Sequence, residues 1–105
     1  MLHDNLKMIT GKNYDIISYL CKKYDVDKLW AFGSVCTNMF SDKSDIDLLI
    51  SFNDISVEKY TDNYFNLHDS FENIFKRPVD LLTVKMLSNP YLIKVMEKTK
   101  TLIYG

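Results

Sequence analysis

Glycine and cysteine are scarce in this sequence, and each shortage excludes a class of protein. Three glycines in 105 residues cannot supply the Gly-x-Gly-x-x-Gly turn of a dinucleotide-binding domain. The two cysteines, Cys21 and Cys36, lack the spacing of a metal-ligand pair. Residues 1–4 show neither the basic start nor the apolar run of a signal peptide. We therefore expect a protein of the reducing cytoplasm.

Long apolar runs and an excess of one charge are also missing. The longest apolar run lies around Leu48–Ile50, far short of the roughly 20 residues that a membrane-spanning helix needs. Thirteen basic and 14 acidic residues give a net charge of -1, so the overall charge provides no positive electrostatic field that would attract a polyanion such as nucleic acid. The only arginine is Arg77, and the lysines are scattered. These features argue against membrane association and against nonspecific nucleic-acid binding.

The hydrophobic content of 47% is enough for one compact core, so residues 1–105 are expected to form a single domain. Seven tyrosines and six phenylalanines accompany the single tryptophan, which predicts an aromatic core. Tyr64 and Phe65 together are a candidate docking surface for a second subunit, either a copy of this chain or a different protein, although packing in the core is the simpler reading.

Hydrophobic spacing and capping residues indicate an α+β domain whose small sheet is covered by helices. The first helix is expected to start after the break at Gly11–Asn13, with Asn13 as its cap. The second helix is expected to be capped by Ser56 or Asp54. The predicted elements are a helix over 14–24, a strand over 29–32, a strand over 46–52, a helix over 57–75, a strand over 79–83, a helix from Pro90 to about Lys98 and a strand over 101–104.

Two carboxylates mark the start of the clearest strand. Because side chains alternate along a strand, Asp45 and Asp47 project from one face, roughly 7 Å apart at their Cα atoms. Acidic ligands that converge in this way suit two-metal phosphoryl chemistry, in which ions roughly 3.5 to 4 Å apart hold the attacking and leaving oxygens. Asp80, on the strand over 79–83, would supply a third ligand and a base toward an acceptor hydroxyl if the two strands are neighbours.

A glycine and a hydroxyl precede this acidic pair by a short loop. Gly33 has no Cβ and lets the backbone approach a phosphate closely. Ser34, expected at the start of a following helix, offers its hydroxyl and nearby amides to the same group. We therefore predict that Gly33 and Ser34 form a nucleotide-binding site that faces the acidic metal site.

These motifs resemble the minimal nucleotidyltransferase family of the DNA polymerase beta superfamily, on the runs 32–34, 44–50 and 79–82. The resemblance implies a mixed sheet flanked by helices, with Mg²⁺ or Mn²⁺ bound by Asp45, Asp47 and Asp80. It implies transfer of a nucleoside monophosphate from a nucleoside triphosphate, often ATP, with pyrophosphate leaving. Family members of this size are frequently encoded beside a HEPN-domain protein, and such pairs resemble toxin-antitoxin systems. A hydroxyl on that partner protein is the acceptor that the resemblance suggests.

One departure from the family leaves a second hypothesis open. Relatives commonly carry an Arg-x-Arg-Gly-like run after Gly-Ser, whereas this sequence has Val-Cys-Thr-Asn over 35–38. Lys43, Arg77 and Lys85 are the nearby cations that could replace the missing arginines at the triphosphate. If none of them does, the chain would be a catalytically weak binding module that neutralises or scaffolds its partner by contact. Metal-dependent phosphohydrolysis is a more distant third hypothesis.

Simpler structural roles compete with the functional ones. Asp45 and Asp47 could be solvated residues on an exposed strand, with Asp80 capping a turn, but clustered carboxylates repel one another unless a cation offsets them. His3 and His68 are interpreted as surface residues without a role. Cys36 has no histidine nearby in the sequence and is interpreted as a packing residue.

Overall fold

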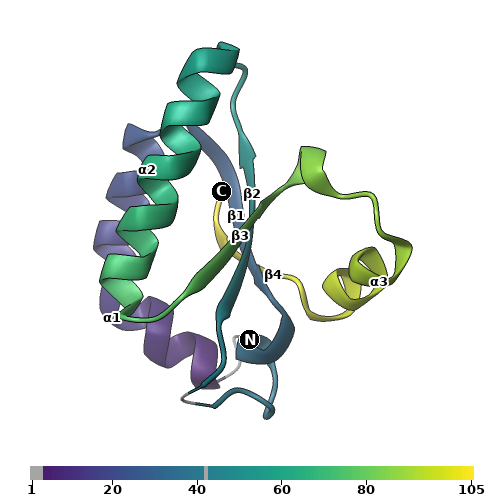
Figure 1. The fold of residues 1–105 in the computed structure, drawn as a ribbon. Coiled ribbons are helices and arrows are strands. Elements are labelled where there is room, and N and C mark those ends of the chain that lie inside the picture. The colour runs from purple at the N-terminus through teal and green to yellow at the C-terminus, as the bar shows by residue number, and fades with distance from the viewer. Residues whose placement is uncertain (1–3, 42) are drawn as a thin grey trace.

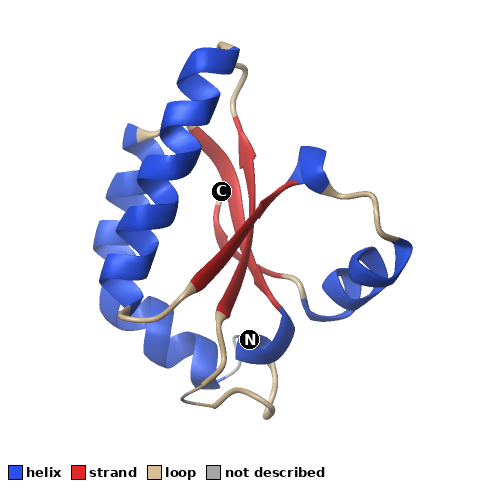
Figure 2. Ribbon diagram, in the orientation of Figure 1, coloured by secondary structure: helices blue, strands red, loops and turns tan. Residues whose placement is uncertain are grey.

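The computed structural model describes residues 4–41 and 43–105 of the chain (Figure 1). The described chain contains α-helices, β-strands and two short 3-10 turns (Figure 2). In chain order the elements are α1 (Asp4–Lys23), β1 (Val26–Phe32), η1 (Gly33–Cys36), β2 (Ile46–Phe52), α2 (Val57–Phe75), β3 (Val79–Thr83), η2 (Val84–Met86), α3 (Pro90–Thr99) and β4 (Thr101–Tyr104).

The four strands form one mixed sheet in the order β3-β2-β1-β4. Strand β1 is antiparallel to both β2 and β4, whereas β2 and β3 are parallel. Helices α1 and α2 lie side by side against one face of the sheet, and α3 lies on the other (Figure 1). This arrangement confirms the expected α+β class and the mixed sheet flanked by helices.

Each face of the sheet carries its own apolar core. On the face toward α1 and α2, strand residues such as Ile46, Leu48 and Leu81 are at most 2% exposed. On the face toward α3, Leu49 packs in a smaller cluster with Phe32 and Met96. The side of β2 that carries Asp47 is therefore partly core.

The first helix is longer than the sequence predicted. The expected start after Gly11–Asn13 was wrong, because α1 runs from Asp4 through Gly11 without a break. Leu6 is 1% exposed within the main core, and the Thr10 hydroxyl donates to its carbonyl over 2.7 Å. Burial of an apolar side chain contributes about 2 kcal/mol, which outweighs the roughly 1 kcal/mol that glycine costs in a helix interior. His3 lies outside the described residues.

The remaining elements follow the predicted bounds closely. The strands over 46–52, 79–83 and 101–104 and the helix over 57–75 are confirmed. Ser56 caps α2 by accepting the Lys59 amide hydrogen over 3.2 Å. Strand β1 begins three residues earlier than expected, because Val26 is buried and pairs with Phe52. Among the described residues no helix combines the length and apolarity needed to cross a membrane.

Polar contacts join α2 to the start of β3. His68 was expected to be a surface residue, but it is half-buried and its Nε2 lies 3.0 Å from the carbonyl oxygen of Val79. The Glu72 carboxylate accepts the amide hydrogen of Val79 over 2.9 Å. Tyr64 donates its hydroxyl to the Leu81 carbonyl over 2.5 Å, so it belongs to the packed layer. Phe65 is 60% exposed, and its role in an interface stays a prediction.

Asn63 fixes α2 against the turn between α1 and β1. It is 6% exposed, and its amide donates to the Tyr24 carbonyl over 2.9 Å and to the Asp25 carboxylate over 3.2 Å. We expect Asn63→Leu to lower the free energy of unfolding by about 1–3 kcal/mol, because it leaves the partly buried Tyr24 carbonyl without this donor. Urea denaturation measures this change. Asn66→Leu, at an exposed position of the same helix, should stay within about 0.5 kcal/mol, and equal losses would contradict the assignment.

Candidate active site

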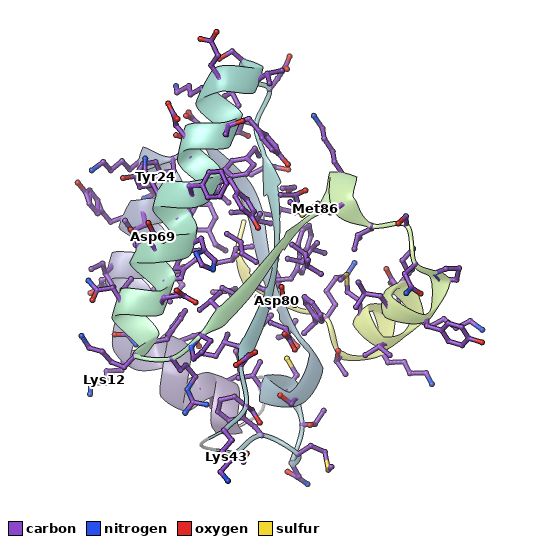
Figure 3. The ribbon with its side chains drawn as sticks, in the orientation of Figure 1. Lys12, Tyr24, Lys43, Asp69, Asp80 and Met86 are labelled. Atoms are coloured by element: carbon purple, nitrogen blue, oxygen red, sulfur yellow. The ribbon has the colours of Figure 1, made fainter. Side chains whose placement is uncertain are left out.

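Asp47 and Asp80 are direct neighbours across the parallel pair of β2 and β3. Their Cα atoms are in register, and adjacent strands lie roughly 4.8 Å apart. The residues that flank them, Ile46, Leu48 and Val79, are buried toward α1 and α2, so both aspartates belong to the face toward α3. Figure 3 labels Asp80 on β3. The strands over 46–52 and 79–83 are therefore neighbours, as the predicted participation of Asp80 requires.

Asp47 lies within the electrostatic influence of two other carboxylates, those of Asp45 and Asp80. Asp45 immediately precedes β2 and is exposed, as is Asp80, whereas Asp47 is half-buried. Burial, together with the negative charges of Asp80 and Asp45, raises the pKa of Asp47 from 3.8 to about 6, and burial is the largest of the three causes. Asp45 and Asp80, which come from two different segments of the sequence, therefore both lie close enough to Asp47 to repel its negative charge.

Gly33 stands directly against Asp47. Phe32, at the end of β1, pairs with Asp47 on β2, and the next residue turns away with a φ of 74°. A Cβ added to Gly33 would lie only 2.5 Å from the Asp47 Oδ2 atom, closer than two such atoms can approach. The glycine is thus required both for its left-handed backbone and for the space that the carboxylate occupies.

Ser34 continues this bend into η1 rather than into an α-helix. The expected helix is a single 3-10 turn over Gly33–Cys36, in which the Ser34 carbonyl accepts the Thr37 amide hydrogen over 2.9 Å. The half-buried Ser34 hydroxyl makes no hydrogen bond within the described part of the chain, so it is available to a ligand. Cys36 packs against the core, and burial raises the pKa of its thiol, as expected of a packing residue.

Thr99 is a neighbour of the site that sequence reasoning missed. The Gly33 amide donates to the Thr99 hydroxyl over 2.8 Å, and that hydroxyl donates to the Val95 carbonyl over 3.0 Å. The last turn of α3 therefore holds the glycine bend in place. A phosphate that takes the Gly33 amide must replace the Thr99 hydroxyl. No local pattern could have revealed a contact between residues 66 positions apart.

The three cations considered as replacements for the missing arginines are placed differently. Arg77 donates to the carbonyls of Ser41 and Ser44 over 3.1 and 3.0 Å and lies 4.5 Å from the Phe40 ring centre. It therefore braces the loop that leads to Asp45. Lys85 follows the far end of β3, five residues or roughly 16 Å along the chain from Asp80. Lys43 is exposed on the loop before Asp45.

The donor chemistry of the site fits a hard divalent cation. Carboxylate oxygens are the ligands that Mg²⁺ and Mn²⁺ prefer, and an ion would offset the repulsion among Asp45, Asp47 and Asp80. No lysine or arginine forms an ion pair with any of the three among the described residues. Nor does that part of the chain gather three His, Cys, Asp or Glu side chains into a ready-made cage. Asp45, Asp47 and Asp80 stay the predicted ligands of the ion.

The raised pKa of Asp47 predicts a pH-dependent stability. The ordinary pKa of 3.8 rises to about 6 in the folded protein, so protonated Asp47 is favoured on folding. Its contribution is complete below about pH 4 and is lost as the pH rises through about 6. In EDTA, the wild-type protein should lose thermal stability relative to Asp47→Asn over this range. Parallel melting curves for the two proteins across these pH values would contradict the assignment.

Similarity to known proteins identifies the family. The family described as Polymerase beta, Nucleotidyltransferase matches residues 14–105. The chain belongs to this nucleotidyltransferase family. A protein of Methanocaldococcus jannaschii, named as a provisional protein adenylyltransferase, is 34% identical over 93 residues, which cover 89% of each chain. The resemblance read from the Gly-Ser and Asp-Ile-Asp runs is thereby confirmed.

Solved structures share the fold of this nucleotidyltransferase. A chain from a toxin-antitoxin structure with AMP-PNP superposes with a TM-score of 0.67 and 19% identity, over 89% of this chain and 73% of that one. A chain from a tri-AMPylated Shewanella oneidensis HEPN toxin in complex with MNT antitoxin gives 0.62 and 18% identity, over 91% and 72%. At such identities the likeness shows the nucleotidyltransferase fold alone.

Proposed function

We propose that this nucleotidyltransferase transfers AMP from ATP to a hydroxyl group of a protein partner, in a reaction that depends on Mg²⁺. The observation that carries the proposal is the contact between the Gly33 bend and Asp47, which is itself in register with Asp80. The proposed phosphate-binding bend and the proposed cation site are therefore adjacent at one end of the sheet. The named activity of the M. jannaschii relative supports the choice of AMP and of a protein acceptor.

Each residue of the proposed active site has a distinct role. The Gly33 bend and the Ser34 hydroxyl bind and orient the phosphates of the nucleotide. Asp45 and Asp47 would hold Mg²⁺, which would neutralise the phosphate charge and help pyrophosphate to leave. Asp80 completes the ligand set and accepts the proton of the acceptor hydroxyl. The acceptor oxygen then bonds to the α-phosphorus as the bond to pyrophosphate breaks.

The exposure of the site suits a macromolecular acceptor. Asp45 and Asp80 are both exposed, so a hydroxyl on a second protein can approach them. A protein related to the HEPN toxin of the AMPylated complex is the partner we propose, with this chain as its antitoxin. Such a pair would act in the cytoplasm, where ATP is available.

The position of the label in ATP tests the proposal. The chain would be incubated with Mg²⁺ and a HEPN-type protein encoded beside it, using ATP labelled at either the α- or the γ-phosphorus. We expect the α-label to become attached to the partner, the γ-label to remain in pyrophosphate, and EDTA to prevent the transfer. Attachment of the γ-label, or release of phosphate without an acceptor, would contradict adenylyl transfer.

The same experiment separates catalysis from neutralisation by contact. If the partner remains unlabelled, and an Asp45→Asn, Asp47→Asn double variant still neutralises it, the chain acts as a binding module. Thermal melting adds an independent measurement, since Mg²⁺ and ATP should raise the melting temperature of the wild-type chain but not that of the double variant.

A further inference from the structure

A cavity lies at the opposite end of the two strands that carry Asp47 and Asp80. It has a volume of about 350 Å³ and is lined by the ends of β2 and β3, the segment between β2 and α2, the start of α2 and the start of η2. Asp80 and Met86, labelled in Figure 3, mark the two ends of the path from the carboxylates to η2. The cavity shares no residue with the proposed catalytic site.

A buried hydroxyl in the cavity wall lacks a hydrogen bond. Thr83, the last residue of β3, lines the cavity and is 2% exposed. Its Oγ1 atom has no partner among the described residues. Such a buried hydroxyl is costly unless something bonds to it, and its position on a cavity wall makes a ligand the candidate partner.

The other walls define the chemistry of that ligand. Ile50 and Phe52 supply apolar surface, and the Tyr60 ring packs edge-on against Phe52 with their centres 5.0 Å apart. The Lys85 ammonium lies 5.2 Å from the Tyr60 ring centre, and the exposed Asp54 carboxylate also lines the cavity. A flat ring can pack on Tyr60, an anionic group can pair with Lys85, and vicinal hydroxyls can donate to Asp54.

The topology also favours a ligand at this end. Strands β2 and β3 are parallel, and the cavity lies beyond their carboxyl ends, which is where ligands of open parallel sheets generally bind. A volume of this size falls in the usual range for small-molecule sites. The aspartates lie instead at the amino ends of the same two strands.

We propose that this cavity is a second ligand site, which takes a nucleoside 5′-monophosphate. The base packs on Tyr60 and hydrogen-bonds to the Thr83 hydroxyl, the ribose hydroxyls donate to Asp54, and the phosphate pairs with Lys85. This site is independent of the transfer reaction, and it places a nucleotide at the far end of the strands that carry the catalytic aspartates.

Amide NMR with AMP as the probe tests the site. In EDTA, AMP should shift the amide signals of Asn53, Thr83 and Lys85 in a saturable way, in both the wild-type chain and Asp47→Asn. Shifts confined to residues 33–47, or no shifts at millimolar AMP, would overturn the proposal. Because the measurement is binding and not transfer, its failure leaves the adenylyltransferase proposal standing, and the reverse also holds.

Thr83 variants give the sharper test. Thr83→Val should weaken AMP binding by roughly tenfold, because it removes a hydrogen bond to the ligand. The same change should raise the melting temperature of the ligand-free chain by roughly 4–8 °C, because it removes an unpaired buried hydroxyl. Thr83→Ser keeps the hydroxyl and should retain binding within a few-fold. A Thr83→Val protein that melts lower than the wild type, or binds AMP as tightly, would overturn the proposal.

Lys85 tests the phosphate end of the ligand. The wild-type chain should bind AMP several-fold more tightly than adenosine, and Lys85→Met should abolish that preference while leaving adenosine binding unchanged. Inorganic phosphate alone should not compete at the same concentration. If phosphate competes as well as AMP does, the cavity binds anions only and the nucleoside assignment is wrong.

Discussion

Replacing Gly33 with alanine is expected to abolish nucleotidyl transfer while leaving most of the fold intact. The backbone there has a φ of 74°, a conformation that costs an alanine about 1–2 kcal/mol. The added methyl would lie 2.5 Å from the Asp47 Oδ2 atom, so the carboxylate must leave its position. A misplaced metal ligand costs far more activity than stability, and we expect a loss of at least about a hundredfold in transfer rate.

A second glycine of the same chain provides the matched control. Gly11 lies inside α1, and a Cβ built on it meets no atom within 4 Å. Gly11→Ala should therefore stabilise the protein by about 0.5–1 kcal/mol through a better helix propensity and leave transfer unchanged. The two variants would be compared by urea denaturation and by label transfer from ATP. Wild-type transfer by Gly33→Ala would disprove the close fit between the glycine bend and Asp47.

Asp47→Asn is expected to lose transfer by at least about a hundredfold and to melt at a higher temperature than the wild type at neutral pH without metal. The loss of activity is expected because Asp47 is one of the proposed metal ligands. The gain in stability follows because burial and the charges of Asp80 and Asp45 disfavour the ionised Asp47 side chain. Label transfer and thermal melting in EDTA measure the two effects on the same protein.

The opposite signs of these effects separate a catalytic carboxylate from a structural one. If the Asp47 carboxylate served only to stabilise the fold, its replacement by asparagine would lower the melting temperature of the protein. Asp62→Asn, at an exposed position of α2, is the control and should alter neither property. Lower stability of Asp47→Asn with retained transfer would show that Asp47 supports the fold and not the reaction.

The strands that carry the acidic residues could be predicted from the sequence because their signals are local. The strand over 46–52 alternates apolar residues toward one face, and Pro78 and the Ser88–Pro90 turn bound the segment that holds the strand over 79–83. The Gly-Ser pair ends an apolar run in the way that a strand followed by a tight bend requires. These patterns depend only on residues that are close together in the sequence, so the local sequence is sufficient to predict them.

Other features depend on contacts between distant segments and left no local pattern. Helix α1 continues through Gly11 because Leu6 is buried in the main core. The Gly33 amide is held by Thr99, and Arg77 braces the loop before Asp45 rather than serving as a free cation. Each contact joins segments that lie far apart in the sequence, so helix propensity and residue spacing could not indicate it.

The sequence by itself determined the chemical groups of this nucleotidyltransferase: two strands with carboxylates near their starts, and a glycine-serine bend before the first of them. Only the tertiary structure decided that β2 and β3 are parallel neighbours in register, which brings Asp80 beside Asp47. It also decided that the ends of these strands line a cavity, into whose wall it places a Thr83 hydroxyl with no hydrogen-bond partner in the described part of the chain. The physical reason is that strand pairing and cavity formation depend on how distant segments pack, whereas the alternation of side chains depends only on the chain itself.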